Sequence, residues 1–220
     1  MIHIYYHIYA IEGVEPIIEE QLTLIEKWID VPYILNVGIS IANDNSPTDK
    51  IIQKFYNYQK PNYRIRDVRS KGHEMITLDL IEKDKEKFGD SDYILYIHTK
   101  GASKQNDDKL QNVTSWRHLM NYFNIEKWKD AMEVFTNTSY NTYGVLFGKA
   151  GNWTIYSGNF WWMRGSYAKT LNLEGVKKNS RYSAEHSFIQ MGEDWKPYSP
   201  YNREGEDHYS ILFERKEYEK

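Results

Sequence analysis

A histidine and a lysine follow the most strand-like segment of the chain. The segment Asp92–His98, DYILYIH, is rich in β-branched and aromatic residues, and Thr99, Lys100 and Gly101 come directly after it. A lysine ammonium can balance the negative charge that develops on a departing phosphate, and a histidine can ligate a metal ion or donate a hydrogen bond. The structural alternative is that His98 caps the strand and that Lys100 is solvated. Both side chains are candidates for binding an anion, and His98 is also a candidate metal ligand.

An aromatic segment with few parallels elsewhere in the chain runs from Tyr156 to Arg164, YSGNFWWMR. Gly158 allows a close backbone approach, and the Asn159 amide is both a donor and an acceptor among aromatic neighbours. Trp161 and Trp162 are adjacent, so they point to opposite faces of a strand, and one can be in the core while the other lines a cleft. The segment is therefore a candidate wall of a binding pocket.

Two further charged residues lie near predicted helix starts. Arg117 follows Trp116, where the partial positive charge of a helix start favours anions over cations, so contact with a phosphate or carboxylate would explain it. The alternative for this segment is a purely structural face that packs on the sheet. Glu185 lies at the start of a short helix, where a carboxylate commonly interacts with the helix dipole.

The first hundred residues alternate between strand and helix patterns. Strands are expected at Ile2–Tyr9, Tyr33–Ser40, Tyr63–Val68 and Asp92–His98, with helices at Val14–Trp28, after the turn 44–47, and at His73–Phe88. This order predicts a parallel sheet with right-handed crossovers. Ligands of such sheets bind beyond the carboxyl ends of the strands, which brings His98 and Lys100 to the expected site.

The second half of the chain predicts fewer strands and a C-terminal arm. We expect a long helix at Trp116–Phe135, strands at Thr142–Gly148 and Tyr156–Arg164 with a helix near Gly165, and a short helix at Ala184–Met191. The fold class is α/β, with a central, mostly parallel mixed sheet of about six strands. Residues 1–195 form the expected catalytic domain, and 196–220 form an arm or lid packed on it.

Composition narrows the class of protein. The 220 residues include no cysteine, which excludes disulfides and thiolate metal sites, and the formal net charge of −3 gives no overall basic field for nucleic acid. No apolar run is long enough for a membrane span, and the N-terminus lacks signal-peptide features, so a cytoplasmic location is expected. The 19 Tyr and 7 Trp suit the binding of sugars, although an AT-rich genome also favours Tyr.

The layout from Ser70 to Thr99 resembles the nucleotide-binding half of GT-A glycosyltransferases. A turn at Lys71-Gly72 and a helix that carries the polar Thr77 precede a hydrophobic strand. In that family the strand ends in an Asp-x-Asp metal motif, whereas here the slot holds His98-Thr99-Lys100. The patterns YILYIHTKG, WRxxMxYF and SGNFWW are similar to those of small glycosyltransferase-like domains of bacteria and of large DNA viruses, where they are implicated in capsid glycan synthesis.

This resemblance implies a Rossmann-like GT-A fold and transfer of a hexosyl or deoxyhexosyl group from a nucleoside-diphosphate donor, expected to be a UDP-sugar, to a glycan hydroxyl. The residues expected to contact the nucleotide are Tyr9, Gly38, Thr77, His98 and Lys100. Those expected to contact the sugar or the acceptor are Arg117, Asn159, Trp161, Trp162 and Arg164. In inverting members an acidic residue after the aromatic segment is the general base, and Glu185 stands in the matching order. His98 is the position at which Mn²⁺ or Mg²⁺ would bind.

Two other classes of function remain open from the sequence. The missing Asp-x-Asp motif would suit a non-catalytic carbohydrate-binding module that keeps the fold. A nucleotidyltransferase shares a related α/β core, but the chain has no basic Gly-rich loop near its N-terminus to hold a triphosphate. The expected partners are a nucleotide-sugar and a glycan or glycoprotein acceptor, and not nucleic acid.

Overall fold

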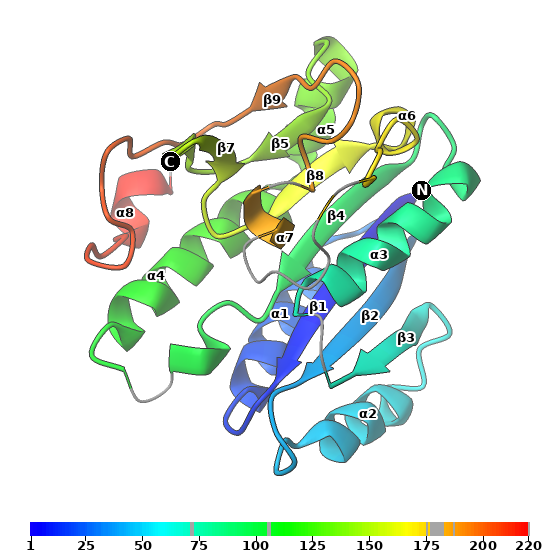
Figure 1. Ribbon diagram of the computed structural model, residues 1–220, viewed down its shortest axis with the longest axis vertical. Helices are drawn as coiled ribbons and strands as arrows, with labels where there is room; N and C mark the ends of the chain where they lie inside the picture. Colours follow the sequence, from blue (N-terminus) through cyan, green and yellow to red (C-terminus); the bar gives the residue numbers. More distant parts are fainter. Residues whose placement is uncertain (71–72, 105–106, 175, 177–182, 187, 220) are drawn as a thin grey trace.

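The computed structural model describes residues 1–70, 73–104, 107–174, 176, 183–186 and 188–219. These segments form an α/β fold around a mixed sheet flanked by helices (Figure 1). The strands of this sheet are β1 (Ile2–Ala10), β2 (Tyr33–Ile41), β3 (Tyr63–Arg69), β4 (Tyr93–His98), β5 (Thr142–Gly144), β8 (Trp161–Arg164) and β9 (Pro197–Tyr198). The predicted fold class is confirmed, with seven strands in the described sheet where about six were expected.

The strand order is β3-β2-β1-β4-β8-β5-β9. The first four strands in this order are parallel, and β8 is antiparallel to both of its neighbours, β4 and β5. The carboxyl ends of β1 to β4 therefore meet at one edge of the sheet, where parallel sheets bind their ligands. Because β8 runs the other way, its carboxyl end lies at the opposite edge, where Arg164 pairs with Tyr93 at the start of β4.

Helices cover both faces of the sheet. The helices are α1 (Glu15–Trp28), α2 (Thr48–Asn57), α3 (Met75–Asp84), α4 (Leu110–Asn121), α5 (Trp128–Asn137), α6 (Gly165–Ala168), α7 (Ser183–His186) and α8 (Arg215–Tyr218), with 3₁₀ turns at Lys85–Lys87 and Ala102–Lys104. Figure 1 shows α3 in front of the strands and α1 behind them. Successive side chains of β1 point to opposite faces of the sheet, and each face packs against its own set of helices. Tyr6 packs with α1, α4 and α5, whereas Tyr5 packs with α3 and α6.

The segment predicted as the long helix Trp116–Phe135 is divided in the structure. α4 already begins at Leu110, and a π-helical segment, Tyr122–Glu126, separates it from α5. The Lys127 amide donates to the carbonyl oxygen of Tyr122 at 2.8 Å, which closes the wide turn. The hydrophobic period carries across the break, because residues of all three pieces pack on the same face of the sheet.

Two predicted strands are also divided. Leu146 has a φ of +56° between β5 and β6 (Phe147–Ala150), and β6 pairs with β7 (Trp153–Tyr156) in a separate two-stranded sheet. The predicted strand Tyr156–Arg164 is interrupted by a turn in which Gly158 and Asn159 have φ values of +90° and +60°. The predicted helix Ala184–Met191 corresponds to α7, Ser183–His186, and position 187 lies outside the described residues.

The C-terminal segment packs on the rest of the chain. β9 pairs with β5 at the sheet edge, and the buried rings of Phe213 and Tyr218 join the core cluster that contains α4. The Phe213 amide donates to the Ser115 hydroxyl on α4 at 3.0 Å. This segment reaches from the sheet edge to α4, and so it can form one wall of a site between them.

Candidate functional site

A cleft lies beyond the carboxyl ends of β1 and β4. We call it the strand-end cleft, and its lining residues are His7, Tyr9, His73, Glu74, His98, Thr99, Lys100, Gly101, Ala102, Ser103, Lys104, Val113, Glu185 and Tyr209. The Tyr9 amide donates to the Thr99 hydroxyl at 2.9 Å, which ties the two strand ends together. The predicted residues Tyr9, His98, Lys100 and Glu185 are therefore brought to one site, as the parallel topology requires.

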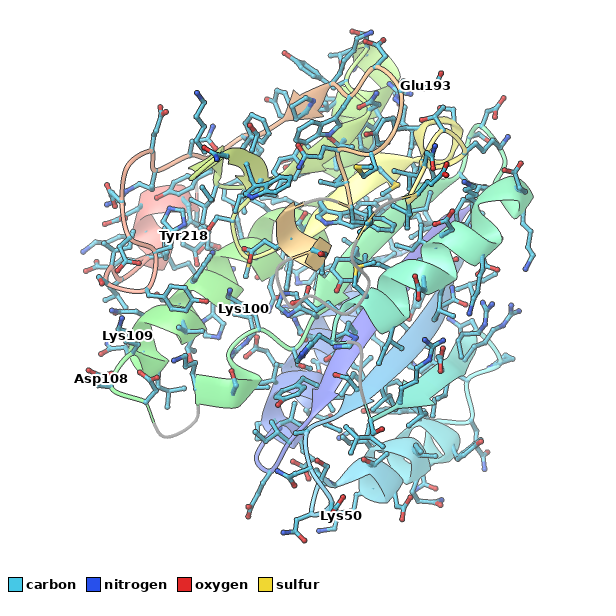
Figure 2. All side chains as sticks on the ribbon, viewed as in Figure 1. Lys50, Lys100, Asp108, Lys109, Glu193 and Tyr218 are labelled. Atoms are coloured by element: carbon cyan, nitrogen blue, oxygen red, sulfur yellow. The ribbon has the colours of Figure 1, made fainter. Side chains whose placement is uncertain are left out.

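Lys100 is a cation of this cleft without a carboxylate partner in the described part of the chain. Its Nζ lies 3.9 Å from the centre of the Trp116 ring and 5.3 Å from that of Tyr209. Gly101 follows with a φ of +90°, and a Cβ there would lie 3.0 Å from Val113. Figure 2 shows Lys100 beside α4, far from Lys50 and Glu193. The ammonium group is thus held by aromatic rings and faces a cleft that suits an anion.

His98 is almost fully buried and is held from two sides. Its Nε2 donates to the carbonyl oxygen of Gly158 at 2.8 Å, and its Nδ1 lies 3.9 Å from Glu74 Oε1. Burial lowers the pKa of His98, which keeps the ring neutral at neutral pH. A neutral ring that donates through Nε2 has a lone pair on Nδ1. His98 therefore binds the Gly158 peptide and presents only Nδ1 to Glu74.

The carboxylate of Glu74 was not anticipated from the sequence. Glu74 precedes α3, and its Oε2 accepts hydrogen bonds from Asn159 Nδ2 at 2.7 Å and from the Tyr96 hydroxyl at 3.0 Å. Burial acts to raise the pKa of Glu74, but His98, His7 and these two hydrogen bonds outweigh it and lower the pKa. A glutamate at a helix start is common, and nothing in the sequence links it to Asn159, 85 residues later.

Glu185 lies between the strand-end cleft and a second cleft. The second, which we call the hairpin cleft, is lined by Trp116, residues 146–150 and 155 of the β6–β7 region, Ser157, Glu185 and residues 203–209. Among the described residues, Glu185 and Tyr209 line both clefts. Glu185 Oε1 accepts a hydrogen bond from the Gly158 amide at 3.1 Å. Gly158 therefore contacts Glu185 through its backbone amide and His98 through its backbone carbonyl.

Two of the predicted nucleotide contacts lie behind the wall of the strand-end cleft. Thr77 is fully buried, and its hydroxyl hydrogen-bonds His7 Nδ1 at 3.0 Å. A Cβ on Gly38 would lie 2.2 Å from Thr77 Oγ1, so the glycine is needed for α3 to pack on β2. Burial lowers the pKa of His7 to about 3, and its Nε2 is 3.0 Å from the Ser40 hydroxyl. In this structure Gly38 and Thr77 support the cleft without lining it.

Arg117 does not line either cleft. Its guanidinium is 5% exposed and makes a two-pronged ion pair with Glu20, with Nε and Nη2 each 3.0 Å from a carboxylate oxygen. Its Nη1 donates to the carbonyl oxygen of Lys100 at 3.0 Å. The arginine therefore fixes the backbone at Lys100 and joins α4 to α1. The sequence-based assignment to the sugar or acceptor is replaced by this structural role.

The aromatic segment also differs from expectation. Both Trp161 and Trp162 are fully buried, with Trp161 stacked on Tyr96 and the Trp162 indole donating to the Asn124 carbonyl oxygen at 2.9 Å. Neither indole lines the strand-end cleft or the hairpin cleft, because both rings are packed in the core on the two faces of β8. Arg164 donates to the Tyr140 and Thr138 carbonyl oxygens at the opposite edge of the sheet.

Asn159 reaches the site indirectly. It is buried, its Oδ1 accepts from the Trp161 indole at 2.8 Å, and its amide orients Glu74.

Few side chains of the described residues could ligate a metal ion at this site. Among the described residues no three side chains of the His, Cys, Asp or Glu types gather to hold a metal. In the strand-end cleft, His98 Nδ1 and Glu74 Oε1 are a pair of candidate ligands, and they are 3.9 Å apart. Two protein ligands would leave most of the coordination of Mn²⁺ or Mg²⁺ to donor phosphates and water. We therefore derive no chemical step through a metal at His98.

The comparisons with known proteins return structures of low similarity. A crystal structure of S. aureus TarS residues 1–349 in complex with UDP-GlcNAc is 13% identical, with a TM-score of 0.48, and the match covers 96% of this chain and 61% of that one. The structure of TarS 1–349 without that ligand is 14% identical, with a TM-score of 0.46, and 92% and 60% are covered. This chain thus spans about three fifths of the TarS chains. No curated protein matches.

In the described segments, no helix combines the length and the apolar character that crossing a membrane requires. A family model described as "Domain of unknown function (DUF8361)" matches residues 4–198, which include both strand ends of the cleft and Glu185. The match extends over most of the chain, and the protein belongs to the DUF8361 family.

Proposed function

We propose that this protein is a glycosyltransferase that moves a sugar from a nucleoside-diphosphate donor, a UDP-sugar, to a glycan hydroxyl with inversion. The observation that carries the proposal is the position of Glu185 between the strand-end cleft and the hairpin cleft. A carboxylate between two clefts can accept a proton from a group bound in one while that group attacks a molecule bound in the other.

The donor is assigned to the strand-end cleft. This cleft lies where parallel α/β sheets bind ligands, and Lys100 offers its ammonium group to a diphosphate there. Tyr9 and Thr99 are at the strand ends beside it, where a nucleoside can bind. The stacking of Lys100 on Trp116 keeps the charge in place before the donor arrives, so little reorganisation is needed when charge develops on the leaving group.

The acceptor is assigned to the hairpin cleft. It combines aromatic and aliphatic side chains, including Trp116 and Phe147, with polar groups of residues 203–209. Such a mixture suits a sugar, which has apolar faces and polar edges. Tyr209 belongs to both clefts and separates them together with Glu185.

The reaction then follows from these positions. Glu185 takes the proton of the acceptor hydroxyl, and the oxygen forms a bond to the anomeric carbon of the donor sugar from the face opposite the diphosphate. The bond between that carbon and the diphosphate oxygen breaks, and its electron pair leaves with the nucleoside diphosphate. Lys100 balances the added negative charge. The configuration at the anomeric carbon is inverted because a single displacement takes place from the face opposite the leaving group.

The first test is calorimetric titration with UDP, GDP and UDP-sugars, with Mn²⁺ and again with EDTA. UDP-GlcNAc, the ligand of one TarS structure, is included as a probe. Micromolar binding of one nucleotide supports the proposal, and the EDTA arm separates a metal from Lys100 as the counter-charge. A protein that binds glycans but no nucleotide under either condition would instead be a carbohydrate-binding module.

The second test is the variant Glu185→Gln, which removes the base without changing the size of the side chain. We expect transfer to fall by about 100- to 10,000-fold, with nearly unchanged affinity for the nucleotide. Glu193→Gln is the matched control, since Glu193 is exposed, lines neither cleft and lies far from Lys100 in Figure 2. Substantial transfer by Glu185→Gln would remove Glu185 from the role of base.

A further inference from the structure

We propose that Glu74 is the residue of the strand-end cleft that recognises sugar hydroxyls of the donor, with Oε1 accepting their hydrogen bonds. This inference rests on the proposed function and adds a specificity residue to it. The hydroxyls belong either to the ribose of the nucleotide or to the transferred sugar, and both present the same chemistry to a carboxylate.

The first support is the way in which Glu74 is oriented. Its Oε2 accepts two hydrogen bonds, from Asn159 and from Tyr96, and both of those donors are themselves buried. Burial raises the pKa of Tyr96 well above its ordinary value, so the Tyr96 hydroxyl keeps the proton that it donates. Two fixed donors on one oxygen hold the carboxylate in one orientation. A side chain that recognises a ligand needs such a fixed orientation.

The second support is the other oxygen, Oε1. His98 Nδ1 lies 3.9 Å from this oxygen, and that atom is an acceptor because the Nε2 proton is donated to Gly158. Oε1 therefore receives no hydrogen bond from the described residues, although the Glu74 side chain lines the cleft and is 25% exposed. A charged oxygen that faces a cleft without a donor is suited to ligand hydroxyls.

The third support is that the Glu74 side chain does not cap α3. It occupies the position before α3, but its side chain makes no capping hydrogen bond to the helix and turns to Asn159 and Tyr96 instead. The end of β4, with His98, Thr99 and Lys100, has no carboxylate of its own. Glu74, directly before α3, adds a carboxylate to the cleft that Lys100 lines.

Glu74 and Glu185 both line the strand-end cleft, and their surroundings give them different tasks. Glu74 has a lowered pKa and two donors on one oxygen, and each of these makes it a weaker base. It lines only the strand-end cleft, whereas Glu185 also lines the hairpin cleft. Glu74 is therefore assigned to binding the donor, and Glu185 to proton transfer from the acceptor.

The test is Glu74→Gln, titrated with UDP, 2′-deoxy-UDP and UDP-GlcNAc beside the unchanged protein. The amide keeps an oxygen for Asn159 and Tyr96 but places an NH₂ group where Oε1 was. We expect a loss of affinity of about 10- to 100-fold for the ligand whose hydroxyls Glu74 binds. If these are ribose hydroxyls, UDP and UDP-GlcNAc weaken together and the preference for UDP over 2′-deoxy-UDP disappears. If they belong to the transferred sugar, only UDP-GlcNAc weakens.

A second variant guards against misfolding. Tyr96→Phe removes one donor to Glu74 and keeps the stacked ring, so it should weaken the same ligand by a smaller factor, with an unchanged far-UV spectrum. Equal affinities of Glu74→Gln and the unchanged protein for all three nucleotides would overturn this inference and leave the proposed function standing. Absence of nucleotide binding by the unchanged protein would overturn both.

Discussion

Three charged side chains around the strand-end cleft are fixed by different means, and these means decide what each can do. Lys100 is held by aromatic rings and keeps its charge for a ligand. Glu74 is held through one oxygen and presents the other. Glu185 is held by the Gly158 amide at the boundary with the hairpin cleft. A cation, an oriented acceptor and a carboxylate between two clefts together match what the transfer of a glycosyl group from a diphosphate requires.

Lys100→Met tests the assignment of the diphosphate. The methionine keeps a long apolar side chain on Trp116 but loses the ammonium, so UDP should bind about 10- to 100-fold more weakly. Uridine, which has no phosphate, should bind the two proteins alike, and calorimetric titration measures both. Lys50→Met, on the exposed face of α2, is the matched control. A variant that loses uridine and UDP affinity equally would show that Lys100 supports the nucleoside and not the phosphates.

Residue types alone did not reveal which charged and aromatic side chains face a cleft. Arg117 and Trp161 are of residue types that commonly bind ligands. Arg117, however, is paired with Glu20, and Trp161 is stacked on Tyr96 in the core. The partners lie far away in the sequence, at separations of 97 residues for Arg117 and 65 for Trp161 (positions 161 and 96). Lys100 could be placed at this cleft because it follows a parallel strand, and Glu185 because of the order of segments in the family that the sequence resembles.

At the scale of elements, the turn between β7 and β8 connects the parts of the site. Gly158 has a φ of +90°, its carbonyl accepts from His98 and its amide donates to Glu185. Asn159, with a φ of +60°, hydrogen-bonds Glu74 and Trp161. One tight turn thus positions both carboxylates of the strand-end cleft. A substitution that changes the backbone conformation of this turn should therefore disturb both of them.

Gly158→Ala tests this turn. A Cβ would lie 2.5 Å from Met120 Sδ, and the backbone conformation is strained for alanine, so stability should fall by about 1–3 kcal/mol. Transfer should fall more than the stability loss explains, because the Gly158 amide moves away from Glu185. Urea unfolding and a transfer assay give the two numbers.

The control for this variant is Gly151→Ala. Gly151 lies in the turn between β6 and β7 and lines neither cleft; its φ is +62°, and a Cβ there would meet nothing within 4 Å. This variant has the same kind of backbone strain without the clash, so stability should fall by about 1 kcal/mol and transfer activity should be kept. Gly158→Ala with full activity and full stability would show that the turn tolerates a side chain and does not set the position of Glu185.

The parallel half of the sheet was predictable from the sequence, and the antiparallel half was not. The strands β1, β2 and β4 are largely buried on both faces and read as apolar runs, whereas β3 at the sheet edge alternates between apolar and polar residues. Helical patterns join the four strands, which leaves one topology. β5 to β8 are three or four residues long and turn at positive φ values, including Leu146 and Asn159. Their direction depends on pairing with β4, which the local pattern does not contain. The reversed direction of β8 is why Arg164 lies away from the site.

On the scale of the whole molecule, two carboxylates join elements on the two faces of the sheet. Glu20 is partly exposed and joins two helices, whereas Asp84 is buried and joins a helix to the strands. Glu20 on α1 binds Arg117 and Asn121 of α4, and hydrogen bonds and the charge of Arg117 outweigh burial and lower its pKa to about 2. On the other face, Asp84 binds Arg66 of β3 and Tyr5 of β1, and its pKa is likewise about 2 despite burial. Both groups therefore stabilise the fold in their charged form.

His7 adds a third contribution of a different kind. It is enclosed by Ser40 and Thr77, and burial lowers its pKa to about 3, with nearby His98 and His73 acting in the same direction and Glu74 against it. An unfolded histidine gains a proton below about pH 6.5, whereas the folded one stays neutral down to about pH 3. Stability is therefore lost as the pH falls through this window, by on the order of 4 kcal/mol in total.

Acid should therefore destabilise the protein in two overlapping windows. The contribution of His7 is lost from about pH 6.5 towards pH 3, and that of Glu20, whose ordinary pKa is 4.5, is complete above that value and is lost towards pH 2. Urea unfolding at several pH values measures the free energy in each window. His7→Gln should flatten the dependence from pH 6.5 towards pH 3, whereas Glu20→Gln should flatten it below pH 4.5 only, so the range from pH 6.5 to 5 separates the two. The slope in each window, and not the absolute stability of the variant, is the quantity to compare, because both substitutions also remove buried contacts. Parallel curves for His7→Gln and the unchanged protein above pH 5 would show that His7 takes up its proton in the folded state as readily as in the unfolded chain.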